Sequence, residues 1–296
     1  MIDFEYIAPN QLDDAIRQLV DADGQARVLA GGTDIIVQLR EGHLTAELIV
    51  DVKKIPELTQ LEFFSDQDLQ LGASVPCHRI YENPQVAAAF PALTDAVRII
   101  GGWQIQSRAS VGGNLCNSSP AADSIAPLIV YNAQAHLAGP SGRRTVPVEQ
   151  FCTAPGRNLL EPGELLVTLT LPKQHSRCGS AYQRFIPRNE MDIAVAGAAS
   201  WVRLNETGDR IEEARIALAA VAPTPVRAKE ASEWLAGKAV DEASFTEAGE
   251  LAKRKASPID DMRGTAEYRT HLVGVLTKRT LATACQRAKQ RSSSAT

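Results

Sequence analysis

Two short glycine-containing segments carry the residues best suited to bind a ligand through the main chain. The first is Ala30-Gly31-Gly32-Thr33-Asp34, and the second, further along the chain, is Ser110-Val111-Gly112-Gly113-Asn114. Glycine adopts positive φ readily, so successive backbone N–H groups can point into one concavity. A helix that starts at such a turn adds free N–H groups and the positive end of its dipole. Each segment therefore suits a phosphate group without needing a lysine or an arginine.

Together the two segments predict a clamp for a pyrophosphate. If they face each other, main-chain N–H groups would surround the phosphates from both sides. Ser110 and Asn114 add a hydroxyl and an amide, and Asp123 could accept hydrogen bonds from ribose hydroxyls. A single strand–glycine–helix connection is usually only a tight turn. That plain interpretation stays open for both segments, and their spacing alone does not identify a ligand.

The elements around the first segment follow from hydrophobic periodicity. Apolar residues at helical spacing predict a helix over 10–23, and 26–30 is an apolar strand that ends at the glycines. Ile35, Ile36 and Leu39 then predict a second helix that ends near Gly42. Further strands are predicted at 48–52, 58–64, 68–73, 133–138, 143–147 and 165–171, and helices at 77–82 and 91–100.

The second half of the chain has a different pattern. Three strands rich in Ala and Val are predicted at 180–186, 193–204 and 211–221, followed by helices over about 225–290. Thr224 and Pro225 are the expected cap and first residue of the first helix. The order of elements predicts an α+β fold with two domains, 1–175 and 176–290, and the second domain contains a three-stranded antiparallel sheet with helices.

Composition and charge exclude several classes of protein. The net charge is −4, with 31 basic and 35 acidic residues among 296, so we expect no nucleic-acid partner. No apolar run is long enough to span a membrane, and the acidic N-terminus does not look like a secretory signal. The five cysteines form no C-x-x-C pair, and the histidines have no metal-ligand spacing. We therefore expect a cytoplasmic protein that holds no metal or cluster on its own chain.

The motifs as a set resemble the FAD-binding medium subunits of the molybdenum hydroxylases, the xanthine dehydrogenase and carbon monoxide dehydrogenase family. The resemblance covers nearly the whole chain. It rests on the two glycine segments and on Gly72-Ala73, Ser119-Pro120-Ala121-Ala122-Asp123, Glu164-Leu165-Leu166, Val221-Ala222-Pro223-Thr224-Pro225 and the segment from Asp260 to Arg269. It implies a two-part FAD-binding domain of the PCMH type, followed by a C-terminal domain like that of the carbon monoxide dehydrogenase flavoprotein.

The resemblance also implies the binding residues for FAD. The first segment, with its flanks, would wrap the pyrophosphate, and the second would hold it from the other side. Asp123 would bind the ribityl or ribose region, Ile100 and Leu166 would lie at the flavin, and Arg184 stands where the family often has a lysine. The implied residues are Leu29, Ala30, Gly31, Gly32, Thr33, Asp34, Ile35, Ile36, Ile100, Ser110, Val111, Gly112, Gly113, Asn114, Asp123, Leu166 and Arg184.

The sequence departs from the family at one place before the second segment. The family commonly has Gln-Ile-Arg-Asn there, whereas this chain has Gln104-Ile105-Gln106-Ser107. The difference leaves the glycine segment intact, but any role that requires an arginine at 106 is lost.

The implied function is that of an electron-transfer subunit of a molybdenum hydroxylase complex. FAD would supply the chemistry, so no catalytic side chain is expected. A small iron–sulfur subunit with two [2Fe-2S] clusters and a large subunit with the molybdenum cofactor would be the partners, in a dimer of heterotrimers. NAD or another acceptor would take the electrons. Two alternatives stay open: a self-contained FAD/NADPH reductase of the same fold superfamily, and a non-catalytic nucleotide-binding module.

Overall fold

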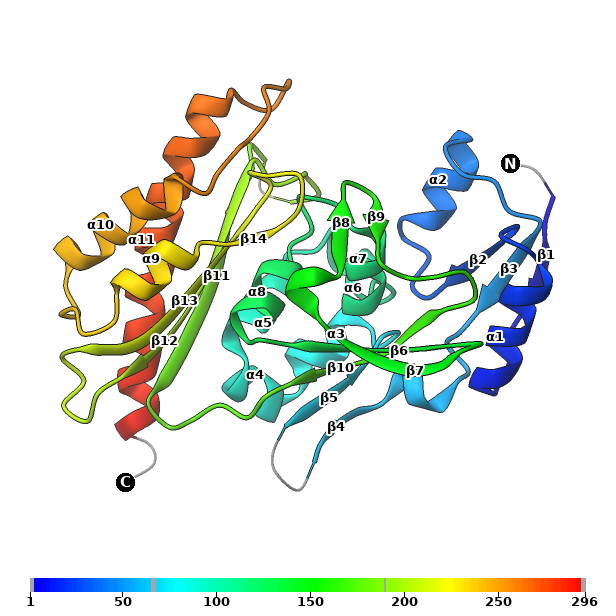
Figure 1. The fold of residues 1–296 in the computed structure, drawn as a ribbon, viewed down its shortest axis with the longest axis horizontal. Helices are drawn as coiled ribbons and strands as arrows, with labels where there is room; N and C mark the ends of the chain where they lie inside the picture. The colour runs from blue at the N-terminus through cyan, green and yellow to red at the C-terminus, as the bar shows by residue number, and fades with distance from the viewer. Residues whose placement is uncertain (1–2, 65–67, 189, 294–296) are drawn as a thin grey trace.

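The structure, a computed structural model, describes residues 3–64, 68–188 and 190–293. Helices and strands are mixed without regular alternation, which confirms the α+β class. The chain passes through three parts in turn, each built on its own main sheet. They follow one another across Figure 1, from the blue N-terminal part through the green centre to the orange and red C-terminal part.

The N-terminal part is a parallel sheet with the strand order β1-β3-β2 and two helices. Leu12 and Ala15 of its first helix belong to a buried cluster that also contains Leu165 and Val167 of the middle sheet. This cluster joins the first two parts. The elements are β1 (Glu5–Ile7), α1 (Leu12–Asp21), β2 (Ala26–Leu29), α2 (Ile35–Glu41) and β3 (Leu48–Asp51).

The middle part contains an antiparallel sheet with the order β4-β5-β10-β6-β7 and a group of short helices. Its first elements are η1 (Pro56–Thr59), β4 (Leu61–Phe63), β5 (Leu69–Gly72), α3 (Cys77–Glu82), α4 (Pro84–Ala89), α5 (Pro91–Val97), α6 (Trp103–Gln106) and α7 (Val111–Asn117). Then follow α8 (Ile125–Val130), β6 (Gln134–Gly139), β7 (Gly142–Pro147), η2 (Val148–Gln150), β8 (Cys152–Ala154), β9 (Arg157–Asn158) and β10 (Leu165–Leu171).

The C-terminal part is an antiparallel sheet with the order β11-β12-β13-β14, and three helices follow or cover it. The long helix α11 lies along this sheet (Figure 1). The elements are β11 (Cys178–Phe185), β12 (Ala196–Leu204), β13 (Ile211–Ala219), β14 (Val226–Arg227), α9 (Lys229–Trp234), α10 (Glu242–Lys253) and α11 (Ala266–Ser293).

Four sequence predictions need correction. The strand expected over 58–64 is shorter, because 58–59 belong to the 3-10 helix η1 and β4 covers only Leu61–Phe63. The C-terminal sheet has a fourth, two-residue strand, because 226–227 pairs with β13. The helix expected to open at Pro225 therefore starts only at Lys229, and Thr224 does not cap it. The second glycine segment is not a turn, since Gly112 and Gly113 lie in the first turn of helix α7. The turn of the hairpin predicted around 65–67 lies outside the described residues.

The C-terminal sheet is buried on both faces. Tyr182, Ala199 and Trp201 face the cluster that also contains residues of α5 and α8 of the middle part. The next positions along the strand, Ala198 and Val202, face a second cluster with α10 and α11. Successive side chains of a strand point to opposite faces, so two apolar faces explain why these strands read as nearly continuous apolar runs.

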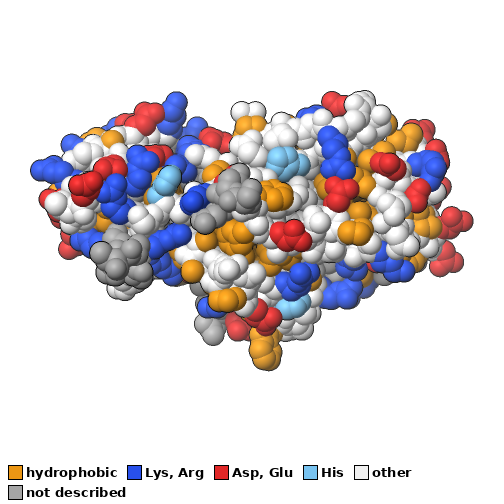
Figure 2. Space-filling model, turned by 90° about the horizontal axis from the view of Figure 1, so that it is seen from below, with side chains coloured by type: hydrophobic (Ala, Val, Ile, Leu, Met, Phe, Trp, Pro, Cys, Tyr) orange, Lys and Arg blue, Asp and Glu red, His pale blue; other side chains and the backbone are white. Residues whose placement is uncertain are grey.

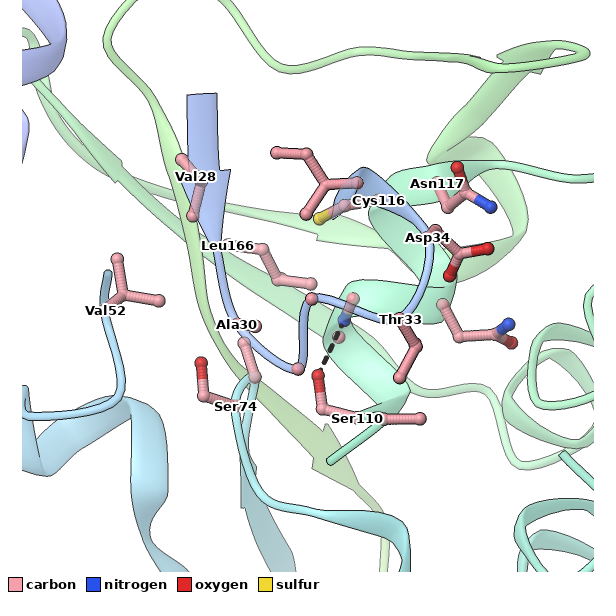
Figure 3. A pocket seen from close by; sticks show the side chains of 18 of the residues that line it. Val28, Ala30, Thr33, Asp34, Val52, Ser74, Ser110, Cys116, Asn117 and Leu166 are labelled. Atoms are coloured by element: carbon pink, nitrogen blue, oxygen red, sulfur yellow. Dashed lines mark hydrogen bonds between the residues drawn. The ribbon is translucent and has the colours of Figure 1, made fainter. Parts of the chain in front are cut away.

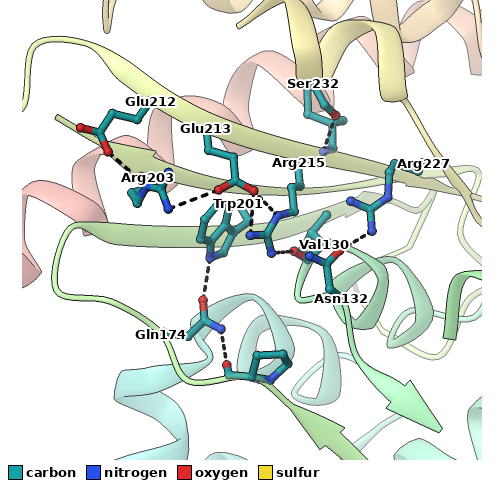
Figure 4. A network of polar contacts seen from close by, with 12 residues as sticks. Val130, Asn132, Gln174, Trp201, Arg203, Glu212, Glu213, Arg215, Arg227 and Ser232 are labelled. Atoms are coloured by element: carbon teal, nitrogen blue, oxygen red, sulfur yellow. Dashed lines mark hydrogen bonds and ion pairs between the residues drawn. The ribbon is translucent and has the colours of Figure 1, made fainter. Parts of the chain in front are cut away.

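Arginines of this sheet bind the end of helix α8 in the middle part (Figure 4). Arg215 donates to the Val130 carbonyl at 3.0 Å, and Arg227 donates to the Ile129 carbonyl at 2.7 Å. The last carbonyls of a helix have no partner within it, so these cations satisfy them. The Arg215 guanidinium also lies 3.8 Å from the centre of the Trp201 ring. The sheet is thus bonded to the middle part by polar contacts as well as by apolar packing.

The surface has no dominant charge on the face seen in Figure 2. Basic and acidic side chains are interleaved in the described part of that face. Many ion pairs among the described residues are exposed and local, such as the pair of Lys229 with Glu233 at 3.8 Å, one turn apart on α9. Among the described residues, no helix is both long and apolar enough to cross a membrane.

The contact of β11 with α11 predicts the effect of one substitution. A Cβ on Gly179 would lie against the Ala284 carbonyl and 2.5 Å from the Ala288 nitrogen of α11. We expect Gly179→Ala to lower the free energy of unfolding by about 2 kcal/mol or more, because helix and strand must separate. Urea unfolding measures this. Gly264→Ala is the control, since its added Cβ would meet only ordinary contacts at 3.4 Å, and equal losses in both variants would refute the explanation.

Candidate functional site

A pocket of about 230 Å³ lies where the N-terminal part meets the middle part. A single water needs only about 10–15 Å³ on this kind of measure, so the space is far larger than a packing defect. The loop after β2, the residues directly after β5, the start of α7 and the strand β10 all contribute to its wall. In Figure 3 the loop from Ala30 to Thr33 crosses the view, with Ser74 and Ser110 below it.

The first glycine segment lines the pocket with unpaired main-chain donors. Among the described residues, no acceptor bonds the N–H groups of the run 31–35. Gly32 has φ of +83°, which a residue with a side chain rarely adopts. Asp34 is the N-cap residue of α2, and its side chain makes no capping bond. This segment therefore offers successive N–H groups to a ligand, as the sequence predicts.

The second segment contributes the first turn of α7. Ser110 caps this helix, because its hydroxyl accepts a bond from the Gly113 N–H at 3.1 Å. The N–H groups of Val111 and Gly112 have no acceptor among the described residues. Both residues are buried, so their free donors require a partner that the described chain does not supply.

Two glycines allow the walls of the pocket to approach each other. A Cβ on Gly31 would lie against the Arg108 carbonyl and 2.9 Å from the Ala109 Cα. The first glycine segment is therefore packed directly on the two residues that precede the second segment. A Cβ on Gly112 would lie against the Ala73 carbonyl and 2.6 Å from its Cα. Close packing of backbone on backbone thus explains Gly31 and Gly112, quite apart from any ligand.

Ser74 is a site residue that the sequence analysis missed. It follows β5, lines the pocket and is 3% exposed. Its hydroxyl has no hydrogen-bond partner, although buried polar groups are normally satisfied. In the sequence, the only indication of its role is its position directly after the Gly72-Ala73 motif. An unsatisfied hydroxyl at the pocket wall fits a polar ligand.

The remaining wall is mainly apolar. Ile100 and Leu166 line it, as expected, and Leu166 is almost fully buried. Val28, Val52 and Leu160 extend this surface. A pocket with an apolar wall and a row of main-chain donors suits a molecule that combines aromatic rings with phosphates.

The structure brings together most of the expected binding residues. Those that line the pocket are Ala30, Gly31, Gly32, Thr33, Asp34, Ile35, Ile100, Ser110, Gly112, Gly113, Asn114 and Leu166. Leu29, Ile36, Val111, Asp123 and Arg184 do not line it. Ile36 is half exposed on α2, and the side chain of Val111 packs in the core.

Asp123 and Arg184 form a buried ion pair behind the pocket wall. Arg184 donates to Asp123 at 2.5 Å, and the Tyr182 hydroxyl donates to the other carboxylate oxygen at 2.8 Å. Burial raises the pKa of Asp123 to about 6, against the opposing effects of Arg184 and Tyr182. Arg184 also donates to the carbonyl of Ile99, the neighbour of Ile100. The pair therefore braces the wall and joins it to β11.

Asn114 is held by the residue that follows Asp123. Its side-chain oxygen accepts bonds from the Ser124 hydroxyl at 2.6 Å and from the Ser124 N–H at 3.3 Å. The orientation of this amide in the pocket is thus fixed. Gln106, where the family commonly has an arginine, is buried and donates to the Arg98 carbonyl at 2.7 Å, which gives it a structural role.

Metal ligands are not gathered in the part of the chain that the structure describes. No three His, Cys, Asp or Glu side chains there could hold one ion. Cys116 lines the pocket, but burial raises the pKa of its thiol to about 12, so this thiol is not reactive at neutral pH.

Comparison with known proteins identifies the family to which this chain belongs. Residues 2–174 match the family model of the FAD binding domain in molybdopterin dehydrogenase, and residues 181–284 match the CO dehydrogenase flavoprotein C-terminal domain. The chain therefore belongs to the family of FAD-binding subunits of the xanthine and carbon monoxide dehydrogenase type. Its cofactor is FAD, and it is part of an oxidoreductase.

The relatives match over nearly their whole length. The xanthine dehydrogenase FAD-binding subunit of Escherichia coli O157:H7 is 33% identical over 286 residues, which cover 96% of this chain and 97% of that protein. The carbon monoxide dehydrogenase medium chain of Hydrogenophaga pseudoflava is 32% identical over 278 residues, 94% of this chain and 96% of that one. A solved structure of that organism's carbon monoxide dehydrogenase superposes with a TM-score of 0.92 at 32% identity, covering 97% and 99% of the two chains.

The pocket fits FAD on its own features. Main-chain donors without acceptors suit its diphosphate, the apolar wall suits its rings, and the Ser74 hydroxyl has capacity for a further bond.

We expect Ser74→Ala to weaken FAD binding about 3- to 10-fold, because one hydrogen bond is lost. The melting temperature should stay the same, since this hydroxyl has no protein partner.

Flavin fluorescence titration and thermal melts measure the two effects of this substitution. Ser180→Ala is the matched control, because Ser180 is equally buried but bonds Tyr131 and does not line the pocket. It should lower the melting temperature and leave FAD affinity unchanged. Unaltered FAD affinity in Ser74→Ala would remove Ser74 from the site.

The Asp123–Arg184 pair predicts a second pattern. Asp123→Ala leaves the Arg184 guanidinium buried without its carboxylate, so we expect a loss of about 3–5 kcal/mol in the free energy of unfolding. The double variant Asp123→Asn/Arg184→Met should lose less than Asp123→Ala, because no buried charge remains. Urea unfolding of the wild type, Asp123→Ala, the single variants Asp123→Asn and Arg184→Met and their double variant decides. Strictly additive losses would show that the two side chains do not depend on each other.

Proposed function

We propose that this chain is the electron-transfer subunit of a molybdenum hydroxylase complex. When bound, FAD supplies the redox chemistry, taking electrons from [2Fe-2S] clusters of a partner subunit and giving them to NAD or another acceptor. The proposal rests on a pocket lined by unpaired main-chain N–H groups, in a chain that matches medium subunits over nearly their whole length. That match also favours this function over a self-contained NADPH reductase or a bare nucleotide-binding module.

Within this function the chain binds and orients. Main-chain N–H groups of both glycine segments hold the diphosphate, and the dipole of α2 adds to the positive potential there. Ile100 and Leu166 contact the flavin, and Ser74 adds a hydroxyl. The proposed binding residues that line the pocket are Ala30, Gly31, Gly32, Thr33, Asp34, Ile35, Ile100, Ser110, Gly112, Gly113, Asn114 and Leu166. The set proposed from the sequence also contains Leu29, Ile36 and Val111, which adjoin these residues in the chain but do not line the pocket, and Asp123 and Arg184. Of these, Asp123 and Arg184 act from behind the wall, by bracing it.

The partners follow from the relatives. The Hydrogenophaga pseudoflava protein is called a medium chain, and the corresponding protein of Paenarthrobacter nicotinovorans is a subunit of the 6-hydroxypseudooxynicotine dehydrogenase complex. We propose a small iron–sulfur partner and a large partner with the molybdenum cofactor, in a dimer of heterotrimers. We also propose that the FAD-binding domain ends near 175, between the end of β10 and the start of β11.

The proposed clamp is tested by two glycines with the same φ. Gly32 and Gly24 both have φ of +83°, but of the two only Gly32 lines the pocket. A valine is disfavoured at this φ in both places, and at Gly32 its Cβ would also meet the Ile36 and Leu29 side chains at 3.0 and 3.1 Å. We expect Gly32→Val to purify without FAD and Gly24→Val to keep it, as measured by flavin absorbance per chain. Full flavin content in Gly32→Val would refute the clamp.

The proposed complex is tested by co-purification. The chain, expressed with its two partner subunits, should carry iron and molybdenum at fixed stoichiometry, and substrate should bleach the flavin absorbance. In the Gly32→Val complex, iron and molybdenum should remain, while electron transfer to the acceptor is lost. A chain that purifies alone and oxidises NADPH with its bound flavin would instead identify the self-contained reductase.

A further inference from the structure

A lysine outside the pocket holds the first glycine segment in place. The Lys53 ammonium donates to the Ala30 carbonyl at 2.9 Å. Lys53 lies two residues beyond the end of β3, the strand paired in parallel with β2, and it does not line the pocket. Its partner Ala30 is the first residue of the glycine segment, directly after β2.

The lysine is itself fixed by a buried carboxylate. Asp51 is only 7% exposed. Its carboxylate pairs with the Lys53 ammonium at 2.8 Å and accepts a hydrogen bond from the Lys53 main-chain N–H at 2.9 Å. The Tyr6 hydroxyl, from β1, donates to the same carboxylate at 2.6 Å. Burial acts to raise the pKa of Asp51, but the bonds from Lys53 and Tyr6 outweigh it and hold this pKa below the usual range. The carboxylate is therefore charged at neutral pH.

The segment has few other restraints. Among the described residues, main-chain bonds hold it at its two sides. Before it, the Val52 N–H donates to the Leu29 carbonyl, and at its end the N–H groups of Ile36 and Gln38 in α2 donate to the carbonyls of Gly32 and Asp34. Between them, the bond from Lys53 is the only hydrogen bond to the main chain of 30 and 31. The packing of Gly31 on the Arg108–Ala109 backbone is the other restraint.

A bond to the Ala30 carbonyl also sets the direction of a donor. No cis peptide bond occurs among the described residues, so the Ala30 carbonyl and the Gly31 N–H point in opposite directions across one rigid plane. Holding the oxygen towards Lys53 turns the Gly31 N–H away from it. The unpaired donors of the segment begin with this N–H.

We infer that Lys53, held by Asp51 and Tyr6, is a positioning residue that aims the main-chain donors of the first glycine segment at the FAD diphosphate. The inference rests on the proposed placement of the diphosphate at the two glycine segments. Pre-organised donors bind more tightly because their ordering is completed before the ligand arrives. The effect should therefore be confined to ligands that carry the diphosphate.

The test measures binding of three ligands to the full chain stripped of flavin. FAD and ADP carry the diphosphate, and riboflavin carries no phosphate. We expect Lys53→Met to weaken FAD and ADP alike, about 10-fold, and to leave riboflavin unchanged. Lys53→Arg keeps a cationic donor and should restore most of the affinity. Lys54→Met is the matched control, because its neighbour Lys54 is exposed and makes no contact with the segment.

A purely structural role for Lys53 would give a different result. Lys53→Met would then weaken all three ligands together, and that outcome, or unchanged binding of FAD and ADP, overturns the inference. Tyr6→Phe removes only one bond to Asp51, so it serves if Lys53→Met does not fold, with an expected loss of about 3-fold for FAD and ADP alone. If a folded Tyr6→Phe variant binds FAD and ADP as tightly as the wild type does, or weakens riboflavin as much as FAD and ADP, the positioning role of Lys53 is refuted.

The inference and the proposed site can fail separately. Gly32→Val, tested with the same ligands, reports on the placement of the diphosphate. If Gly32→Val binds ADP as the wild type does, the site itself is misplaced and the inference falls with it. If Gly32→Val loses ADP binding while Lys53→Met keeps it, only the positioning role is refuted.

Discussion

The central feature of the pocket is a set of main-chain N–H groups that have no acceptor in the described chain. The run 31–35 and the start of α7 both have such donors at one pocket, and Gly112 lines it from a buried position. Buried main-chain donors are almost always satisfied in folded proteins. In the proposed site a diphosphate supplies the missing acceptors, and its charge would need no lysine in contact because the donors and helix dipoles balance it. The surrounding elements serve to bring these two sets of donors together.

The affinity of the proposed clamp depends on how rigidly its two glycine segments are held. Gly31 packs on the backbone before α7, and Gly112 packs on Ala73 after β5. On the other side, the buried Asp123–Arg184 pair ties the pocket wall to β11, and Arg215 and Arg227 tie α8 to the C-terminal sheet. The C-terminal part thus supports the pocket by bracing its wall.

Sequence patterns predicted the α+β class, most strands and the first glycine segment, because period and glycine chemistry are local properties. They failed where partners distant in sequence decide. Residues 226–227 form a strand only because β13 offers an edge. The helix at Gly112-Gly113 is a local failure instead, because the Ser110 cap lies only three residues away and the low helix propensity of glycine pointed to a turn. Ser74 and the bracing role of Asp123 could not be predicted, since an unsatisfied hydroxyl and a buried ion pair exist only in the folded chain.

The most direct measurement of this account is a crystal structure of the full chain with FAD bound. The account predicts diphosphate oxygens within about 3 Å of main-chain nitrogens from both the run 31–35 and the start of α7, with no cationic side chain in contact. A diphosphate bound elsewhere, with these N–H groups bonded to ordered water, would contradict the central claim.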